Sequence, residues 1–177
     1  MLGVLLAMVA CGRASTTSKA QGPATEAPAL AAVTADQVLQ KVREPGAKAV
    51  VINVWATWCT PCREEFPDLM QLRREYERRG LRLVLVSADF PDQTEEARRF
   101  LTQQGVDFPT FLKTGKDMEF INGLDERWSG ALPATFVYDA RGALRSFREG
   151  RTTHAVMESL VVAAMTPQWM TRKELLR

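Results

Sequence analysis

The sequence has few residues that bind metal ions. Among its 177 residues there are one histidine and three cysteines. Two of the cysteines, Cys59 and Cys62, have a spacing that zinc sites use, but a structural zinc site needs two further Cys or His ligands. Cys11 and His154 are the candidates that remain. We therefore expect no metal site in this chain.

Long hydrophobic runs and blocks of like charge are also missing. The apolar segment at residues 1–10 is too short to span a bilayer. The chain has 23 basic and 21 acidic side chains, so its charge is nearly balanced, and no basic cluster points to a nucleic-acid partner. The length is sufficient for one domain with a hydrophobic core.

The two ends of the chain differ in composition from the middle. Met8-Val9-Ala10-Cys11 resembles a bacterial lipobox, although no Lys or Arg precedes the apolar run and Met8 stands where Leu is usual. Residues 1–11 are therefore predicted to be a signal peptide that ends in a lipidated Cys11. Residues 12–32 are rich in Ala, Ser, Thr, Pro and Gly without a hydrophobic period, which predicts a flexible tether. Residues 167–177 form a tail whose structure stays open.

The stretch from Val50 to Pro67 is the most informative part of the sequence. It begins with five β-forming residues that show little alternation, which is typical of a strand buried on both faces. A charged amphipathic segment follows, and it predicts a helix. Cys59 falls at the first turn of that helix, and Pro61 is tolerated there because the first-turn N–H groups have no partner inside the helix.

This placement gives the two cysteines different expected roles. The N-terminus of a helix favours a thiolate, so Cys59 is predicted to be the nucleophile. Cys62 lies one turn later on the same face and is predicted to be the resolving thiol. A purely structural disulfide is the alternative, but a cross-link that closes so short a loop removes little entropy from the unfolded chain.

The segment WATWCTPCREEFP resembles the active site of the thioredoxin superfamily, and is most similar to the TlpA/ResA-like envelope thiol-disulfide oxidoreductases. The resemblance covers residues 33–165. It implies dithiol-disulfide exchange with no cofactor other than the redox-active Cys59–Cys62 disulfide. Thr60 departs from the Pro that is common at its position. The positions that match the family motifs are Asn53, Trp58, Cys59, Pro61, Cys62, Glu65, Pro67 and Pro133.

The remaining pattern predicts an α/β fold. Capping residues and apolar periods predict helices near residues 34–43 and 92–105 and a strand at 81–88. The alternation of strands and helices implies that this strand and the strand before Cys59 form a parallel pair. Residues 132–139 and 143–147 form a predicted antiparallel hairpin, and a last helix is expected to bury Val156, Leu160 and Val161. The expected architecture of residues 33–166 is a thioredoxin-like domain with a central mixed sheet flanked by helices. Within residues 106–130 the pattern favours a strand at 108–112 and a helix at 117–128, with little periodicity to fix either. Residues 106–130 match the position of the insertion that TlpA/ResA-like proteins carry before the cis-proline strand.

Three residues are assigned to client binding by the resemblance. Pro133 stands where the superfamily has a cis-proline beside the CxxC motif, and Leu132 would offer its backbone to an incoming peptide. Trp58 precedes the first cysteine and would also contact the client. The alternative for Pro133 is a trans proline at the start of an edge strand.

One carboxylate and three further residues complete the predicted site. Glu65 lies one turn beyond Cys62 and could relay the proton of the resolving thiol, although a glutamate on the surface of a helix is the alternative. Asn53 stands where cytosolic-type thioredoxins carry a buried Asp. Asn53, Thr60 and Pro61 are predicted to support the active site.

We therefore expect a monomeric reductase in the cell envelope or periplasm, anchored through lipid on Cys11. Its partners would be client proteins with disulfides, for example in cytochrome c maturation, and a membrane electron donor. Two rival functions are a peroxiredoxin-like peroxide reductase, whose PxxxTxxC pattern is absent between Ile52 and Cys59, and a Cu(I) metallochaperone using Cys59, Cys62 and His154.

Overall fold

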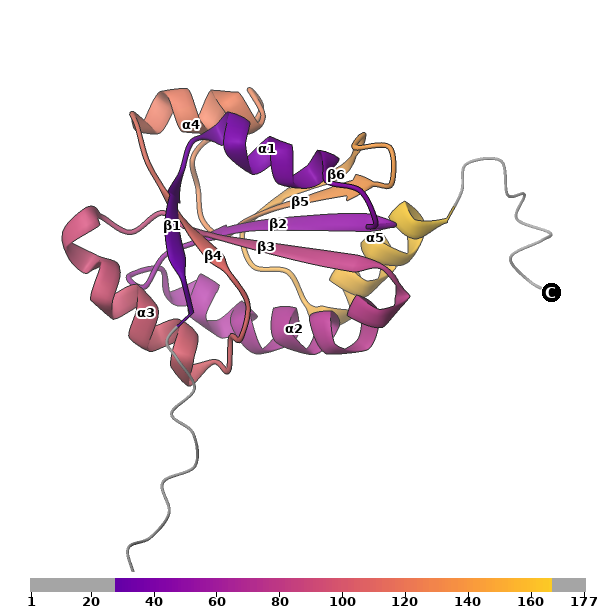
Figure 1. The fold of residues 1–177 in the computed structure, drawn as a ribbon, viewed down its shortest axis with the longest axis horizontal. Coiled ribbons are helices and arrows are strands. Elements are labelled where there is room, and N and C mark those ends of the chain that lie inside the picture. The colour runs from indigo at the N-terminus through magenta and orange to yellow at the C-terminus, as the bar shows by residue number, and fades with distance from the viewer. Residues whose placement is uncertain (1–27, 167–177) are drawn as a thin grey trace, which may run out of the picture.

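The structure is a computed structural model that describes residues 28–166. In this part of the chain, one mixed sheet lies between two layers of helices (Figure 1). The strands are β1 (Leu30–Val33), β2 (Ala49–Trp55), β3 (Leu81–Ser87), β4 (Thr110–Lys113), β5 (Ala134–Asp139) and β6 (Leu144–Glu149). The helices are α1 (Ala35–Arg43), α2 (Thr60–Tyr76), α3 (Thr94–Gln103), α4 (Asp117–Leu124) and α5 (His154–Met165). Two 3₁₀ turns, η1 (Glu77–Arg79) and η2 (Pro91–Gln93), follow α2 and precede α3.

The sheet combines parallel and antiparallel pairs in the order β1-β4-β3-β2-β5-β6. β1, β4, β3 and β2 pair in parallel, whereas β5 runs antiparallel to β2 and to β6. The predicted parallel pair of β2 and β3 and the predicted β5–β6 hairpin are therefore confirmed. Parallel strands end at the same edge of the sheet, so the segments after β2 and β3 lie beside each other.

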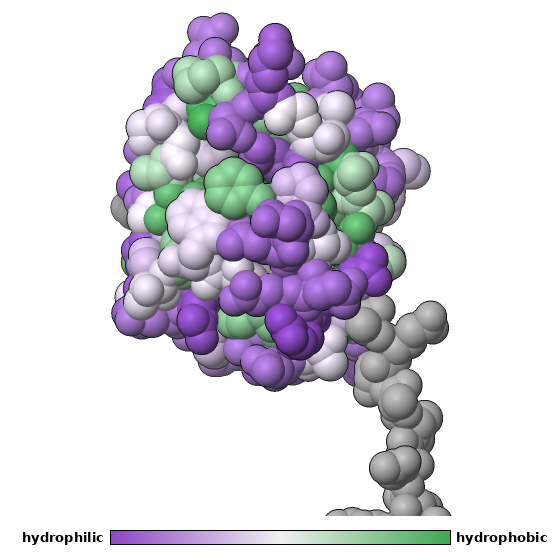
Figure 2. Space-filling model, turned by 90° about the vertical axis from the view of Figure 1, so that its left-hand side faces the viewer, coloured by the Kyte–Doolittle hydropathy of each residue, from purple (hydrophilic) through white to green (hydrophobic). Residues whose placement is uncertain are grey.

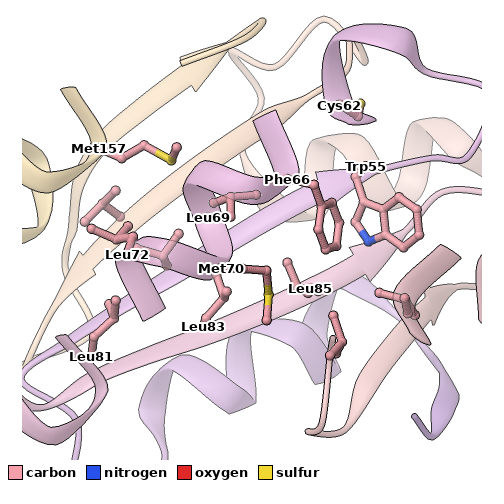
Figure 3. Close-up of a cluster of buried hydrophobic side chains, with 14 of the residues drawn as sticks. Trp55, Cys62, Phe66, Leu69, Met70, Leu72, Leu81, Leu83, Leu85 and Met157 are labelled. Carbon is pink, nitrogen blue, oxygen red and sulfur yellow. The ribbon is translucent and has the colours of Figure 1, made fainter. Parts of the chain in front are cut away.

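β2 is the central strand, and all seven of its residues are buried. Val51 and Trp55 face the core under α2, α3 and α5, whereas Val50, Ile52 and Val54 face the core under α1 and α4. The absence of polar alternation in this strand thus follows from its burial on both faces. Figure 3 shows the first of these cores, where Trp55 lies beside Phe66, with ring centroids 5.1 Å apart.

The first strand corrects the predicted end of the tether. We expected residues 12–32 to lack regular structure, but Leu30–Val33 forms β1 and pairs with β4 in the register Leu30 to Thr110. Leu30 and Val33 are buried while Ala31 and Ala32 are exposed. Two buried side chains and a full set of ladder partners are enough to order a segment whose composition alone predicts a coil. Residues 12–27 of the predicted tether, the signal peptide with Cys11 and the tail at 167–177 lie outside the described residues.

Two further predictions need adjustment. The expected strand and helix within residues 106–130 both exist, but the strand begins two residues later, and the helix ends at Leu124 and not at Trp128. In α5, Val156 is 42% exposed, whereas Met157 and Val161 are buried. The period was therefore correct but its phase was wrong at this position. Within the described residues no helix is long and apolar enough to cross a membrane.

Candidate active site

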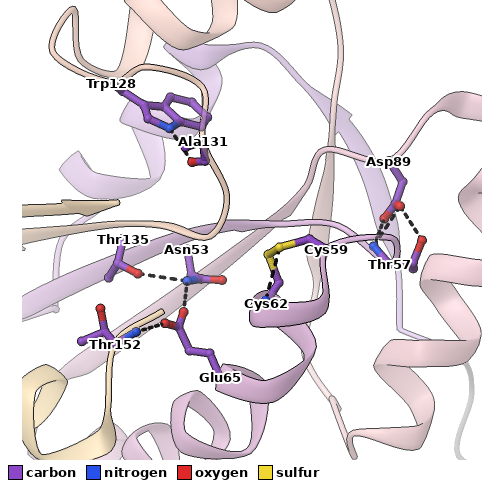
Figure 4. Close-up of a disulfide and its surroundings, with 10 residues drawn as sticks. All are labelled: Asn53, Thr57, Cys59, Cys62, Glu65, Asp89, Trp128, Ala131, Thr135 and Thr152. Carbon is purple, nitrogen blue, oxygen red and sulfur yellow. Dashed lines mark hydrogen bonds between the residues drawn. A yellow bond between two sulfur atoms is a disulfide. The ribbon is translucent and has the colours of Figure 1, made fainter. Parts of the chain in front are cut away.

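The site forms at the carboxyl end of β2, where the chain turns directly into α2. Cys59 is the N-cap residue of α2, and its backbone N–H donates to the carbonyl of Ala56 at 3.2 Å. Cys59 and Cys62 form a disulfide, with Cα atoms 5.3 Å apart (Figure 4). The N–H of Cys62 donates to Cys59 Sγ at 3.2 Å. A first-turn N–H thus points at the sulfur on which a thiolate would form, as the predicted helix position requires.

The two sulfur-bearing residues differ in access to solvent. Cys62 is 1% exposed and packs in the core with Phe66 and Leu69, whereas Cys59 is 6% exposed and lies beside Trp58, which is 55% exposed. An incoming client disulfide would therefore meet Cys59 first. Pro61 occupies the first turn of α2, where its missing N–H leaves no carbonyl of the helix without a partner.

The segment before β5 brings Pro133 to the same end of the sheet. The Leu132–Pro133 peptide bond is cis, so the expected isomer is confirmed and the trans alternative is wrong. Ala134 pairs with Val54 at the end of β2, which places the proline next to the CxxC turn. The carbonyl of Pro133 accepts from Gly150 N at 2.8 Å, whereas the backbone of Leu132 makes no hydrogen bond to any described residue.

Glu65 is fully buried, so the alternative of a surface glutamate is wrong. Its Oε1 accepts from Asn53 Nδ2 at 2.9 Å and its Oε2 accepts from the backbone N–H of Thr152 at 2.5 Å (Figure 4). Burial raises the pKa of this carboxyl to about 7, against the lowering effect of those two hydrogen bonds. A carboxyl group with a pKa near 7 can both accept and return a proton at neutral pH.

Asn53 connects Glu65 to the neighbouring strand. Its Nδ2 also donates to Thr135 Oγ1 at 3.0 Å, so one amide group of β2 holds a residue of α2 and a residue of β5. The residues predicted to take part in thiol exchange thus lie at the end of the sheet where the cysteines are, whereas His154 does not. The structure adds Thr135 and Thr152, which short-range patterns could not identify because they come from strands and loops about 80 positions away.

Asp89 is a buried acidic residue that the sequence analysis missed. Its carboxylate accepts from the backbone N–H of Thr57 at 2.9 Å, from Thr57 Oγ1 at 2.6 Å and from Ser87 Oγ at 2.7 Å. These bonds tie the segment after β3 to the turn that precedes Cys59. The rule that parallel strands end at one edge could have identified it, since Asp89 follows β3 as Thr57 follows β2.

An apolar groove lies beside the disulfide. Its volume is about 220 Å³. Phe90 on its rim is 62% exposed, and Trp58 is the other exposed aromatic residue there. Figure 2 shows the face of the molecule on this side, where apolar and aromatic side chains gather among strongly polar ones. The lining residues are Trp58, Ala88, Phe90, Lys113, Asp117, Ile121, Trp128, Gly130 and Leu132.

The three residues of the copper alternative do not converge. His154 begins α5, and its Nε2 lies 2.9 Å from Glu75 Oε2. Glu75 is near the C-terminal end of α2, about 20 Å along the helix axis from Cys62. A Cu(I) site built from Cys59, Cys62 and His154 is therefore wrong for this structure. Within residues 28–166, no group of three or more Cys, His, Asp or Glu side chains could hold a metal ion.

Comparisons with known proteins agree with this geometry. The profile of the AhpC/TSA family matches residues 23–147. The thiol-disulfide oxidoreductase ResA of Halalkalibacterium halodurans is 29% identical over 121 residues, which cover 68% of this chain and 65% of that protein. The thioredoxin-like protein YneN of Bacillus subtilis is 29% identical over 134 residues, 75% of each chain.

A solved structure has a similar fold. The crystal structure of a thioredoxin-family thiol:disulfide interchange protein from Chlorobium tepidum superposes with a TM-score of 0.60 at 28% identity, over 83% of this chain and all of that one. The matched region spans 65% of the length of the Halalkalibacterium halodurans ResA and 60% of the Bacillus anthracis ResA.

Proposed function

The chain belongs to the AhpC/TSA family, as a TlpA/ResA-like member of the thioredoxin superfamily with a thioredoxin-like α/β fold, and from this premise we propose that it is a thiol-disulfide oxidoreductase that reduces disulfides of client proteins. The observation that carries the proposal is the Cys59–Cys62 disulfide at the N-terminus of α2, next to the cis Leu132–Pro133 bond. Cys59, the more exposed of the two cysteines, follows the exposed Trp58, and the buried Glu65 lies one helical turn beyond Cys62.

The proposed reaction has two exchange steps. The Cys59 thiolate attacks one sulfur of the client disulfide and forms a mixed disulfide, and the second client sulfur leaves as a thiolate. Cys62 then loses its proton to Glu65 and attacks Cys59 Sγ, which releases the client as a dithiol and forms the Cys59–Cys62 disulfide. Two electrons pass from the protein to the client. No cofactor other than this cysteine pair takes part in the proposed reaction.

The groove beside Trp58 and Phe90 is the proposed binding site for the client segment around its disulfide. Its wall is mostly apolar, and it includes Leu132, whose backbone N–H and C=O groups have no hydrogen-bond partner among the described residues. An extended client segment would satisfy these groups by pairing with them as an added strand. The proposed clients are envelope proteins with unwanted disulfides, including apocytochrome c, whose haem-attachment cysteines must be reduced.

The function can be tested with a defined client. A peptide with an oxidised CxxCH motif, incubated with the reduced protein, should appear as a dithiol at a rate proportional to protein concentration. Cys62→Ala should stop at a covalent complex through Cys59, and Cys59→Ala should form no complex. A Cys62→Ala protein that forms no mixed disulfide with the peptide would contradict the proposed reaction.

A peroxide reductase is the rival function that the sequence leaves open, so peroxide must be tested as an alternative oxidant. The peroxidase pattern has Pro and Thr where this chain has Ile52 and Ala56, and both residues are buried and apolar here. We expect the reduced protein to react with the peptide disulfide much faster than with hydrogen peroxide. Faster oxidation by peroxide at equal concentration would favour the alternative.

The proposed location is the cell envelope, with a lipid on Cys11, a tether before β1 and a membrane electron donor that reduces Cys59–Cys62 again. The proposed functional unit is a monomer. Changing Cys11→Ser should move the protein from the membrane fraction to the soluble envelope fraction without a change in peptide reduction in vitro. Unchanged fractionation of this variant would contradict anchoring through Cys11.

A further inference from the structure

The side-chain amide of Asn53 has one atom without a partner. Asn53 is 1% exposed, and its Oδ1 is buried and accepts no hydrogen bond from any described residue. A buried acceptor without a donor costs about 1–3 kcal/mol, and folded proteins keep few of them. The opposite end of the same amide is fully used, because Nδ2 donates to both Glu65 and Thr135.

The free oxygen faces the redox centre. Asn53 lies between Val51 and Trp55, so its side chain is on the face of β2 that α2 covers, in the core to which Cys62 belongs. In Figure 4 the oxygen end of Asn53 points toward the Cys59–Cys62 disulfide, and the nitrogen end points toward Thr135 and Glu65. A disulfide has no hydrogen to donate, whereas a reduced Cys62 has an S–H group. The oxygen is therefore without a donor in the oxidised protein.

We propose that the side-chain amide of Asn53 flips when Glu65 changes its protonation state. Oδ1 faces Cys62 while Glu65 is a carboxylate, and Nδ2 faces Cys62 once Glu65 carries a proton. In the first orientation Oδ1 accepts from the Cys62 S–H. In the second orientation Nδ2 donates to the Cys62 thiolate. Asn53 is thus a positioning residue for the proton transfer of the proposed function.

Both partners of Nδ2 can reverse their roles. Glu65 Oε1 accepts as a carboxylate and donates as an acid, and the Thr135 hydroxyl can rotate to donate instead of accepting. After the flip, Oδ1 of Asn53 therefore accepts from Glu65 and from Thr135. The transfer is balanced, because the S–H bond of Cys62 breaks, one O–H bond forms on Glu65, and the charge moves from the carboxylate to the sulfur.

The surroundings of Glu65 permit this change near neutral pH. The pKa of Glu65 is raised to about 7, chiefly by burial; Asp68 on the same helix contributes to the rise, and Arg151 from the loop before α5 opposes it. Arg151 is itself paired with Glu64 at 2.9 Å. From α5, the backbone N–H of His154 donates to Asp68 at 3.2 Å, and the His154 ring pairs with Glu75.

The composition of the chain allows a direct test by NMR. The sequence has two asparagines, Asn53 and Asn122, and Asn122 is exposed on α4. In the full chain labelled with ¹⁵N-asparagine, the side-chain amide signals of Asn53 should titrate with a midpoint near pH 7, and those of Asn122 should not. Contacts from the Asn53 amide protons should shift from Thr135 above the midpoint to the Cys62 β-protons below it.

The Glu65→Gln variant and the contacts of Asn53 distinguish a flip of the amide from chemical-shift changes that a nearby charge causes without a flip. Glu65→Gln should abolish the titration of the Asn53 signals. Asn53 contacts that stay with Thr135 through the whole titration would overturn the proposal, even if the chemical shifts move. This readout uses no client. If the amide flips in a protein that cannot reduce the peptide, the proposed function is rejected while the inference about Asn53 still holds.

A kinetic arm tests whether the amide matters for resolution. With Cys59 loaded with thionitrobenzoate, release of the chromophore reports the attack by Cys62. Thr135→Ser keeps the hydroxyl and should resolve at the wild-type rate, whereas Thr135→Val should resolve about tenfold more slowly and lose the dependence on pH near 7. Equal rates and equal pH profiles for the two variants would overturn the role of the amide.

Discussion

Cys59 and Cys62 are the same chemical group in two surroundings. Cys59 caps α2 and accepts a backbone N–H, whereas Cys62 is packed into the core one turn later. The positive end of the helix stabilises the thiolate at the cap, and Cys59 is the more exposed of the two cysteines. The difference in role between the two residues follows from position and not from composition.

In the reduced protein we expect iodoacetamide to alkylate Cys59 about tenfold faster than Cys62, because the helix N-terminus stabilises a thiolate on Cys59 whereas Cys62 is packed into the core. Peptide mass spectrometry at a series of times measures both rates in one sample. The same measurement in urea serves as the control, since the rates should converge there. Equal rates in the folded protein would be incompatible with Cys59 as the nucleophile.

Glu65 should make the stability of the oxidised protein fall as the pH rises. Its pKa is about 7 in the folded protein and 4.5 as the ordinary value, so between these values the folded state binds more protons than the unfolded state. The stabilisation is fully present below pH 4.5 and is lost as the pH rises through 7, by about 3 kcal/mol at most.

Urea unfolding of wild type and Glu65→Gln between pH 4.5 and 8 measures this effect. The wild-type free energy of unfolding should decline with pH by that amount relative to the variant, because glutamine does not titrate. Parallel curves for the two proteins would show that Glu65 titrates alike in both states, contrary to its burial.

At the scale of elements, α1 and α4 meet at a position without a side chain. A Cβ atom added at Gly123 of α4 would lie 2.7 Å from Ala35 Cβ of α1, which is closer than two such carbons approach in folded proteins. Ala35 has no flexible side chain that could move aside. The insertion helix can therefore pack on α1 because residue 123 is a glycine.

Gly123→Ala should destabilise the protein by roughly 1–2 kcal/mol, because the overpacking exceeds the gain in helix propensity of about 1 kcal/mol. Asn122→Ala is the matched control on an exposed position of the same helix and should be neutral or slightly stabilising. Thermal and urea unfolding of both variants measure the difference. A Gly123→Ala protein as stable as the control would mean that α4 moves freely on α1.

At the scale of the whole molecule, the direction of electron flow depends on how well the reduced form is stabilised. Thr60 and Pro61 supply no positive charge between the cysteines, and the buried carboxyl of Glu65 disfavours a thiolate on Cys62 whenever it is ionised. We expect a potential below roughly −200 mV, nearer to thioredoxin at about −270 mV than to strong periplasmic oxidants at about −120 mV.

Equilibration against a glutathione series measures this potential. Glu65→Gln should slow the exchange with the peptide while it moves the potential by only about 30 mV. A wild-type potential above about −150 mV would reverse the assignment from reductase to oxidase.

Local patterns in the sequence were sufficient for the main elements and for the cysteine pair. The unbroken apolar run before Cys59 predicts a strand buried on both faces, and β2 is that strand, since burial leaves no room for polar alternation. Capping chemistry predicts that α1 begins directly after Thr34, and the Thr34 hydroxyl accepts from Gln37 N as an N-cap does. Where these signals were weak, as in residues 106–130 and before Val33, the observed boundaries of the elements differ from the predicted ones.

The sequence by itself determined which residues can do chemistry, because a helix start, a CxxC spacing and a proline act through neighbours close along the chain. Only the tertiary structure decided what surrounds them. Glu65 becomes a buried acid with a pKa of about 7 because β2 and the loop before α5 enclose it, and Asn53 meets Thr135 across 82 positions of sequence. Asp89 joins the site because β3 ends beside β2. Burial and long-range hydrogen bonds depend on which strands pair, and no local pattern encodes that pairing.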